Sequence, residues 1–281
     1  MSQEHGQRLF GIFETLYSMN LPNTEVMDLY EGFYSHFYDE FTHMEQWDIE
    51  VFRSIAAATG DPVLDIGCGS GRISLPLAQD GWNVLGLDSS RHMLRLMRQK
   101  LIRHPPEVRQ RVRFRQQDAT ESSTDEAYAL AILGATSICL FRSRQSRLNL
   151  FSSVRTQLKP GGRFAFDYVV PNYKELEAQS ERVQVVTGDS NGNKRFTLFG
   201  ERYLPEEKAQ LVNFYSETVD RSGMTRRFFG STIKSVVEED LLFETLDASG
   251  LEVDEIREYE RPGYFSSHTV KLVVCQPKVP A

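Results

Sequence analysis

Apolar and polar positions alternate in blocks through the middle of the chain. Short apolar runs are separated by segments in which apolar residues recur every three to four positions, the period of a helix. This alternation is typical of parallel strands joined by right-handed helical crossovers. It predicts strands over PVLDI, NVLGL, RVRFRQQ, AYALAILG and RFAFDYVV, and helices over residues 71–80, 90–104 and 144–158.

Two segments lie outside this pattern. We expect residues 1–60 to form an N-terminal helical cap, because LFGIFETLY is amphipathic and LYEGFYSHFYDEF carries an aromatic stripe. Residues 171–235 contain strand-like runs separated by the turn signals NGN and RSG, which predicts an antiparallel β-rich insertion after the fifth strand. The helix EEDLLFETLDASG and the strands LEVDEIREY and HTVKLVVCQ follow.

These elements predict an α/β fold with a Rossmann-like, doubly wound sheet. The sheet should have seven strands, the last of them antiparallel, and should be built from residues 61–170 and 236–281. In such sheets ligands bind beyond the carboxyl ends of the strands. We therefore expect the cap and the insertion to cover a ligand pocket at that edge.

Composition and charge narrow the setting of the protein. The 281 residues carry a net charge of −7, which removes the simplest electrostatic reason to expect a nucleic-acid partner. The chain has no apolar run near the roughly 18 residues of a membrane span, and its first residues lack the pattern of a signal peptide, so we expect a cytoplasmic protein without membrane contact. The three cysteines have no metal-ligand spacing, and we predict no metal.

A glycine-rich turn between the first two strands carries the candidate chemistry. Gly67, Gly69 and Gly71 allow a tight turn whose backbone approaches a ligand closely. Asp88 ends the second strand, 21 residues after Gly67, where a carboxylate can accept hydrogen bonds from both ribose hydroxyls. The spacing predicts a ligand that contains a nucleoside. A nicotinamide dinucleotide remains an alternative, although its fingerprint needs a glycine where Arg72 stands.

The stretch VLDIGCGSGRISLPLAQDGWNVLGLDSS resembles motif I and the acidic strand end of class I S-adenosylmethionine-dependent methyltransferases, particularly the bacterial small-molecule N-methyltransferase type. RQQDAT, AILGAT and LKPGGRFAFD resemble the family's next three strands. The resemblance covers residues 60–170, and residues 236–281 more loosely. It implies S-adenosylmethionine as cofactor and S-adenosylhomocysteine as product.

The resemblance also implies roles for individual residues. Asp118 and the backbone N–H of Ala119 would bind the adenine, and Leu133 and Gly134 would lie beside the methionine part. Asp65 would brace the glycine loop, although a purely structural role stays open. The predicted cofactor-binding residues are Tyr34, Tyr38, Asp65, Gly67, Cys68, Gly69, Gly71, Arg72, Asp88, Ser89, Met93, Asp118, Ala119, Leu133 and Gly134.

Methyl transfer from a sulfonium is an in-line displacement, so the protein must align the reactants and exclude water. A base helps when the acceptor is a protonated amine. Tyr168, at the end of the fifth strand, and Tyr264 and His268, between the last two strands, are the candidates. GATSICLF stands where adenine-N6 enzymes of this fold carry a proline–aromatic motif, which further disfavours nucleic acid.

We therefore predict transfer of a methyl group to an amine of a small metabolite, natural-product intermediate or modified peptide. A hydroxyl acceptor stays open. So does a non-catalytic binding or scaffold subunit, because no residue of the sequence is an unambiguous base. The N-terminal amphipathic helix suggests a homodimer.

Overall fold

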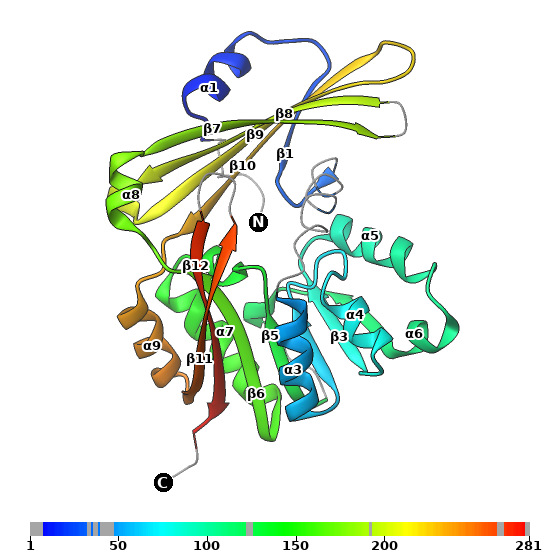
Figure 1. Ribbon diagram of the computed structural model, residues 1–281, viewed down its shortest axis with the longest axis vertical. Coiled ribbons are helices and arrows are strands. Elements are labelled where there is room, and N and C mark those ends of the chain that lie inside the picture. Colours follow the sequence, from blue (N-terminus) through cyan, green and yellow to red (C-terminus); the bar gives the residue numbers. More distant parts are fainter. Residues whose placement is uncertain are drawn as a thin grey trace. The chain divides into compact units, whose positions relative to one another are not determined.

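The computed structural model describes residues 8–32, 35, 39, 48–121, 126–190, 193–262 and 267–278, without the side chains of 189, 190, 193, 261, 262, 267 and 268. The chain forms two compact units (Figure 1). We call them the core unit and the insertion unit. The core unit contains Asp39–Val170, Val237–Pro262 and Ser267–Ala281, and the insertion unit contains Met1–Tyr38, Pro171–Val236 and Gly263–Ser266.

A seven-stranded sheet of order β11-β12-β6-β5-β2-β3-β4 forms the centre of the core unit. The strands from β6 to β4 pair in parallel, whereas β12 is antiparallel to both β6 and β11. The predicted fold class is thus confirmed, including the reversed last strand. The strands are β2 (Val63–Ile66), β3 (Val84–Asp88), β4 (Val112–Gln116), β5 (Tyr128–Leu133), β6 (Leu158–Val169), β11 (Leu251–Pro262) and β12 (Ser267–Pro277).

Helices cover both faces of this sheet, and the central strands are therefore apolar on both sides. Leu64 of β2 packs in one cluster with Phe151 and Leu242 from the helices of one face. Its neighbour Val63 packs in a second cluster with Phe52 from the other face. The helices are α3 (Ile49–Thr59), α4 (Ser74–Gln79), α5 (Arg91–Leu101), α6 (Pro106–Arg111), α7 (Arg144–Gln157) and α9 (Glu239–Ala248). Among the described residues, no helix is long and apolar enough to cross a membrane.

The insertion unit is built on a five-stranded sheet of order β1-β10-β9-β8-β7. Its neighbouring strands pair antiparallel, except that β1 runs parallel to β10. One face is covered by α1 (Gly11–Ser18), whose flanking Phe10 and buried Phe13 pack against Leu198, Leu211 and Tyr215. The strands are β1 (Thr24–Asp28), β7 (Glu181–Ser190), β8 (Asn193–Leu204), β9 (Ala209–Val219) and β10 (Thr225–Ser235), and α8 spans Tyr173–Ala178.

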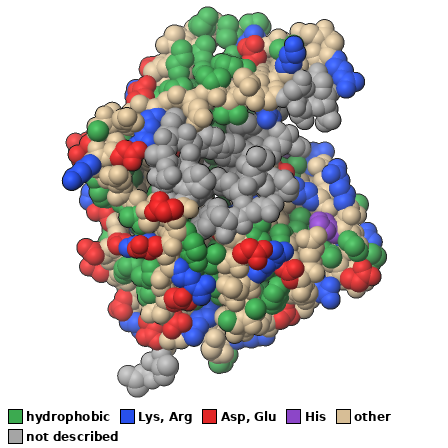
Figure 2. Space-filling view, viewed as in Figure 1, with side chains coloured by type: hydrophobic (Ala, Val, Ile, Leu, Met, Phe, Trp, Pro, Cys, Tyr) green, Lys and Arg blue, Asp and Glu red, His purple; other side chains and the backbone are tan. Residues whose placement is uncertain are grey.

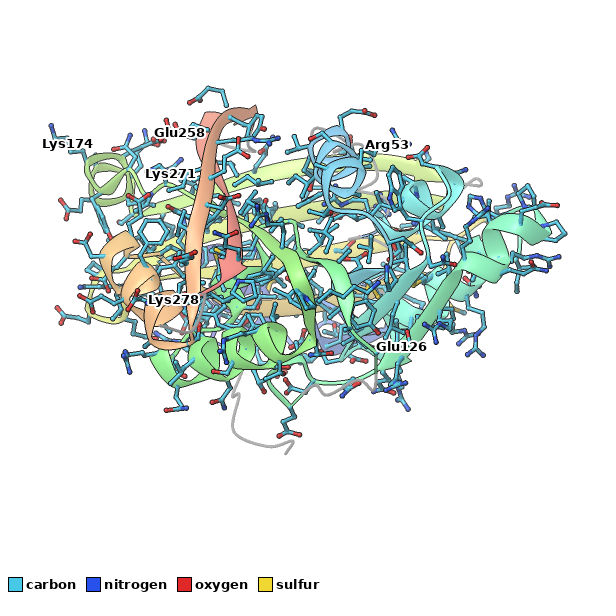
Figure 3. The ribbon with its side chains drawn as sticks, turned by 90° about the horizontal axis from the view of Figure 1, so that it is seen from below. Arg53, Glu126, Lys174, Glu258, Lys271 and Lys278 are labelled. Carbon is cyan, nitrogen blue, oxygen red and sulfur yellow. The ribbon has the colours of Figure 1, made fainter. Side chains whose placement is uncertain are left out.

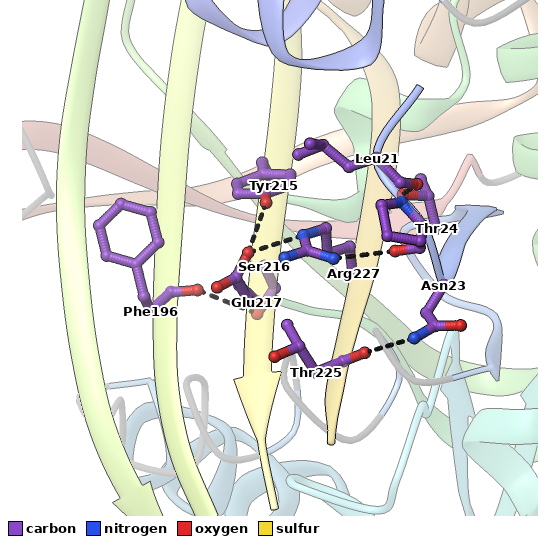
Figure 4. A network of polar contacts seen from close by, with 10 residues as sticks. Leu21, Asn23, Thr24, Phe196, Tyr215, Ser216, Glu217, Thr225 and Arg227 are labelled. Atoms are coloured by element: carbon purple, nitrogen blue, oxygen red, sulfur yellow. Dashed lines mark hydrogen bonds and ion pairs between the residues drawn. The ribbon is translucent and has the colours of Figure 1, made fainter. Parts of the chain in front are cut away.

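The N-terminal segment departs from the predicted helical cap over residues 1–60. Helix α1 and strand β1 belong to the insertion unit, whereas α3 belongs to the core unit. Strand β1 forms because β10 offers its backbone as a partner, which the local sequence does not reveal. Side chains reinforce this pairing (Figure 4): Asn23 donates to the Thr225 carbonyl at 3.1 Å, and Arg227 donates to the Pro22 carbonyl at 2.8 Å.

Candidate cofactor-binding site

The glycine turn follows β2 and leads into α4. Gly67, Gly69 and Gly71 all have left-handed backbones, with φ of 65°, 55° and 88°. An L side chain in this conformation costs roughly 1–2 kcal/mol, which explains why glycine occupies all three positions. The turn is held from within, because the Gly71 N–H donates to the Cys68 carbonyl at 2.9 Å. Its backbone is therefore fixed in shape before any ligand arrives.

Asp88 joins the end of β3 to this turn. One oxygen of its carboxylate accepts from the Gly69 N–H at 2.8 Å, and the other accepts from the Ser90 N–H at 2.8 Å. The backbone carbonyl of Asp88 accepts from the Gln117 N–H at 3.0 Å, which brings the end of β4 alongside. Each carboxylate oxygen has two lone pairs, so it can accept more than one hydrogen bond. This is the chemistry that two ribose hydroxyls require.

The predicted adenine-side residues follow directly after β4. Asp118 is exposed, and its Oδ1 accepts from the N–H and the hydroxyl of Thr120 at 2.8 Å and 2.7 Å. These bonds fix the short 3₁₀ turn Ala119–Glu121. The Ser89 carbonyl accepts from the Gln116 side chain at 3.0 Å. Because β3 and β4 pair in parallel, Ser89 and Asp118 leave the same edge of the sheet.

Leu133 and Gly134, which the resemblance places beside the methionine part, stand at the end of β5, and Leu133 lies near the turn, as does Met93 of α5. A Cβ built on Gly67 would lie 3.8 Å from Leu133 Cδ1, and one on Gly69 would lie 3.0 Å from Met93 Cε. A Cβ on Gly134 would come within 2.5 Å of Ile73 Cδ1 and 3.2 Å of the Phe52 ring, so a side chain here would displace these neighbours. The structure thus brings together the turn, Asp88, Leu133 and Met93.

The loop after β5 contains strained backbone that sequence reasoning missed. Ala135 and Thr136 have φ of 57° and 55°, a left-handed conformation that non-glycine residues rarely adopt. Buried Asp167 of β6 holds the loop by accepting from the Thr136 N–H at 2.9 Å. Strained residues of this kind cluster at binding and catalytic sites. Ala and Thr are not residues that favour φ > 0, so the sequence gives no signal for this strain.

Asp65 of β2 is buried and braces the turn from below. Its carboxylate accepts from the Ser74 hydroxyl at 2.5 Å, which connects β2 to the first residue of α4. Burial raises the pKa of Asp65 to about 7, while the Ser74 hydroxyl and the positive charge of Arg72 oppose this rise. Asp65 therefore changes its protonation close to neutral pH.

Two predicted cofactor-binding residues have other partners. Each terminal nitrogen of the Arg72 guanidinium donates a hydrogen bond to the Asp48 carboxylate at 2.6 Å, and both side chains are largely buried. This pair ties the turn to the residue that precedes α3, which favours a structural role over the predicted contact with the cofactor. Cys68 turns its thiol inward, where a Cβ on Gly86 would lie 2.7 Å from Sγ. Burial keeps its pKa well above the ordinary value, so its side chain acts as packing.

The sequence did not predict a polar cluster on the turn, formed by Ser70, Asp39 and Lys100. The Ser70 hydroxyl donates to the Asp39 carboxylate, and Lys100 of α5 donates to the same carboxylate at 2.5 Å and to Ser70 Oγ at 3.0 Å. In the sequence, Lys100 is one of several basic residues on a helix, a pattern that is typical of a solvated surface. The cluster fixes the outer side of the turn to α5.

Tyr168 is not placed as a catalytic base. It is fully buried in β6, and its hydroxyl donates to Glu239 at the start of α9. Lys271 of β12 donates to the same carboxylate and lies 3.6 Å from Glu258 (Figure 3). Burial and the Glu239 carboxylate raise the pKa of Tyr168 far above its usual range. Its phenol is therefore a structural hydrogen-bond donor, and the prediction of a catalytic role is corrected.

The remaining candidates fall outside what the structure describes. Tyr34, Tyr38 and Tyr264 are outside the described residues. The backbone of His268 pairs with that of Arg261 in the β11–β12 ladder, but its side chain is not described. Their roles stay predictions.

Comparisons with known proteins bear on this geometry. Residues 63–162, which span β2 to the start of β6, match the family model described as a methyltransferase domain. The glycopeptide N-methyltransferase MtfA, solved with S-adenosylhomocysteine, superposes with a TM-score of 0.60 at 22% identity over 97% of this chain and 100% of its own. The core unit has the class I methyltransferase fold.

Two curated relatives resemble the same part of the chain. YqeM of Bacillus subtilis (strain 168), which carries a methyltransferase designation, is 30% identical over 142 residues, 50% of this chain and 55% of its own. The cypemycin N-terminal methyltransferase of a Streptomyces species is 27% identical over 112 residues, 40% of this chain and 43% of its own. The chain thus spans about half the length of the curated relatives it matches.

Proposed function

We propose that the protein transfers a methyl group from S-adenosylmethionine to an amine of a small molecule or a peptide. One observation carries the proposal: the Asp88 carboxylate accepts a hydrogen bond from the Gly69 N–H. This bond joins the end of β3 to the left-handed glycine turn at the carboxyl edge of the sheet. The similarity to a glycopeptide N-methyltransferase in fold and to the cypemycin N-terminal methyltransferase in sequence supports an amine over a hydroxyl.

The donor set fits this cofactor. Asp88 would bind the ribose hydroxyls, and Asp118 with the Ala119 N–H would bind the adenine. The backbone of the turn would lie along the methionine part, beside Leu133 and Gly134. Bound there, the cofactor supplies an activated methyl group on a positively charged sulfur. The chain's own residues would hold it in one orientation and exclude water from the reacting atoms.

The acceptor proposed here is a small molecule or peptide rather than a nucleic acid. The net charge of −7 supports this choice, as does the surface in Figure 2, where Lys/Arg and Asp/Glu side chains are interspersed on the face in view.

We also propose that the protein acts in the cytoplasm. We also propose that His268 or Tyr264 acts as the base that deprotonates the amine.

Mass spectrometry of reaction mixtures tests the proposal. The intact protein is incubated with S-adenosylmethionine and a panel of primary amines, amino sugars and short peptides, each next to its hydroxyl or N-acetylated counterpart. We expect a mass gain of one CH₂ group on amines only, with equimolar S-adenosylhomocysteine. Transfer to the hydroxyl counterparts instead would make the protein an O-methyltransferase. Tight cofactor binding without any transfer would contradict the proposal and favour a binding protein.

A further inference from the structure

Lys100 of α5 faces the glycine turn. Met93, Met97 and Lys100 follow one another at intervals of four and three residues, which places their side chains on one face of the helix. A Cβ built on Gly69 would lie 3.0 Å from Met93 Cε, and one on Gly71 would lie 3.1 Å from Met97 Cγ. The face of α5 that ends with Lys100 therefore packs against the turn, and the lysine adds a positive charge to an otherwise apolar contact.

The Lys100 ammonium group takes part in a closed set of three hydrogen bonds. It donates to Oδ1 of Asp39 at 2.5 Å and to the hydroxyl oxygen of Ser70 at 3.0 Å. The Ser70 hydroxyl donates in turn to the same oxygen of Asp39. We call these three side chains the Ser70 triangle. Because two of its members are charged, its bonds are stronger than those between neutral groups, and they hold the Ser70 side chain in one position.

The Ser70 triangle anchors the middle of the turn. Ser70 stands between Gly69 and Gly71, both of which have left-handed backbones. Glycine allows more backbone conformations than any other residue, so a turn rich in glycine keeps one shape only where its other residues are held. Cys68 and Arg72 hold the turn on either side of Ser70, the first by packing and the second by an ion pair. The shape of the turn between them depends on Ser70.

The residues proposed to bind the nucleoside have anchors of their own outside the turn. Asp88 accepts from the Ser90 N–H at 2.8 Å, and Asp118 accepts from the Thr120 N–H at 2.8 Å. Neither of these bonds involves the Ser70 triangle. Loss of the triangle should therefore leave the contacts with ribose and adenine in place, and it should disturb the backbone that would lie along the methionine part.

We propose that Asp39 and Lys100 are positioning residues for the amino acid part of the cofactor. They act through Ser70, whose hydroxyl they hold, and so fix the middle of the turn in its binding shape. Asp39 lies 31 residues ahead of Ser70, so the N-terminal part of the chain contributes to cofactor binding in a way that motif spacing does not reveal. The inference rests on the proposed function and concerns the selection of nucleosides that carry an amino acid group.

Two ligands separate the parts of the site. S-adenosylhomocysteine and methylthioadenosine share the nucleoside and the thioether sulfur, but methylthioadenosine lacks the amino acid group. Both are titrated by calorimetry into the intact native protein and into Lys100→Met. We expect the variant to bind S-adenosylhomocysteine about tenfold more weakly and methylthioadenosine within about twofold of the native affinity, since bonds to a charged group are lost on the turn alone. Equal losses for the two ligands, or no loss for either, would overturn the proposal.

Two further variants of α5 separate the triangle from the general charge of the helix. Arg95→Met removes a positive charge from an exposed position of the same helix and should change neither affinity. Lys100→Arg keeps a positive donor at the triangle and should bind S-adenosylhomocysteine more tightly than Lys100→Met does. A loss in Arg95→Met as large as that in Lys100→Met, or no recovery in Lys100→Arg, would contradict the proposal.

A double-mutant cycle tests whether Asp39 acts through Ser70. Asp39→Ala and Ser70→Ala should each weaken S-adenosylhomocysteine, and the double variant should bind no more weakly than the weaker single variant, because each change breaks the same bond. Additive losses would show that the two residues act independently and would overturn the triangle. If the native protein binds S-adenosylhomocysteine and every variant binds it equally well, only this inference falls; if the native protein does not bind it, the proposed function falls.

Discussion

At the scale of single residues, backbone conformation and burial explain the glycine turn. The left-handed φ values favour glycine at positions 67, 69 and 71, and this preference was visible in the sequence because glycine adopts them at low cost. The inward thiol of Cys68 and the Arg72–Asp48 pair were not visible. Both depend on partners far along the chain, which local spacing does not encode.

Asp65 leads to a prediction for the pH dependence of stability. Its pKa rises from an ordinary value of 3.8 to about 7 in the folded protein, so between these values the folded state binds a proton that the unfolded state releases. The free energy of unfolding should therefore fall as the pH rises from about 4 to about 7, by up to about 4 kcal/mol, and level off above that. Urea unfolding of Asp65→Asn across this range should show a flatter curve.

Ser74→Ala serves as the matched control for Asp65→Asn. It removes the hydroxyl that favours the ionised carboxylate, so the falling part of the curve should extend to higher pH than in the native protein. Parallel curves for the native protein and Asp65→Asn would show that Asp65 does not titrate in this range.

At the scale of elements, the strands of the core sheet and helices α4, α5, α7 and α9 were predictable, whereas helix α6 and strands β1 and β7 were not. Central strands bury both faces and appear as unbroken apolar runs such as YALAIL. Strand β7 is an edge strand with Val183 and Val185 exposed, and β1 depends on its partner β10. The five residues of β1 carry little pattern of their own, whereas the ten-residue strand β7 lies at a sheet edge and turns its valines outward.

Helix α1 offers a test of packing at this scale. A Cβ on Gly200 of β8 would lie 2.4 Å from the ring of Phe13, which is fully buried. Gly200→Ala should therefore push α1 off the sheet, at a cost of about 1–3 kcal/mol. Hydrogen exchange should accelerate in residues 11–18 and stay unchanged in the core unit.

Gly188→Ala is the control for this substitution. Gly188 lies on the neighbouring strand β7 of the same sheet, where the added Cβ meets the flexible end of Arg195 at 3.2 Å. It should leave the exchange of α1 unchanged. Equal exchange in both variants would contradict the account of how α1 is held.

At the scale of the whole molecule, the chain is arranged around two sheets, one in each compact unit. The core sheet gathers the ends of β2, β3, β4 and β5 at one edge, as its parallel topology predicted. The insertion unit recruits both the N-terminal segment and residues 171–236, which the division expected from the sequence had assigned to separate parts. The division into these two units depends on strand pairing between distant segments. The periodicity of apolar residues along the chain does not reveal such pairing.

Calorimetric titration of S-adenosylmethionine into the intact protein tests the central claim, that Asp88 and the glycine turn hold the cofactor. Asp88→Asn keeps the shape of the side chain but loses an acceptor for the Gly69 or Ser90 N–H, so we predict about 10- to 100-fold weaker binding. Asp61→Asn makes the same charge change before β2, where Asp61 binds Asn83, and should bind like the native protein. An unchanged affinity in Asp88→Asn would contradict the account.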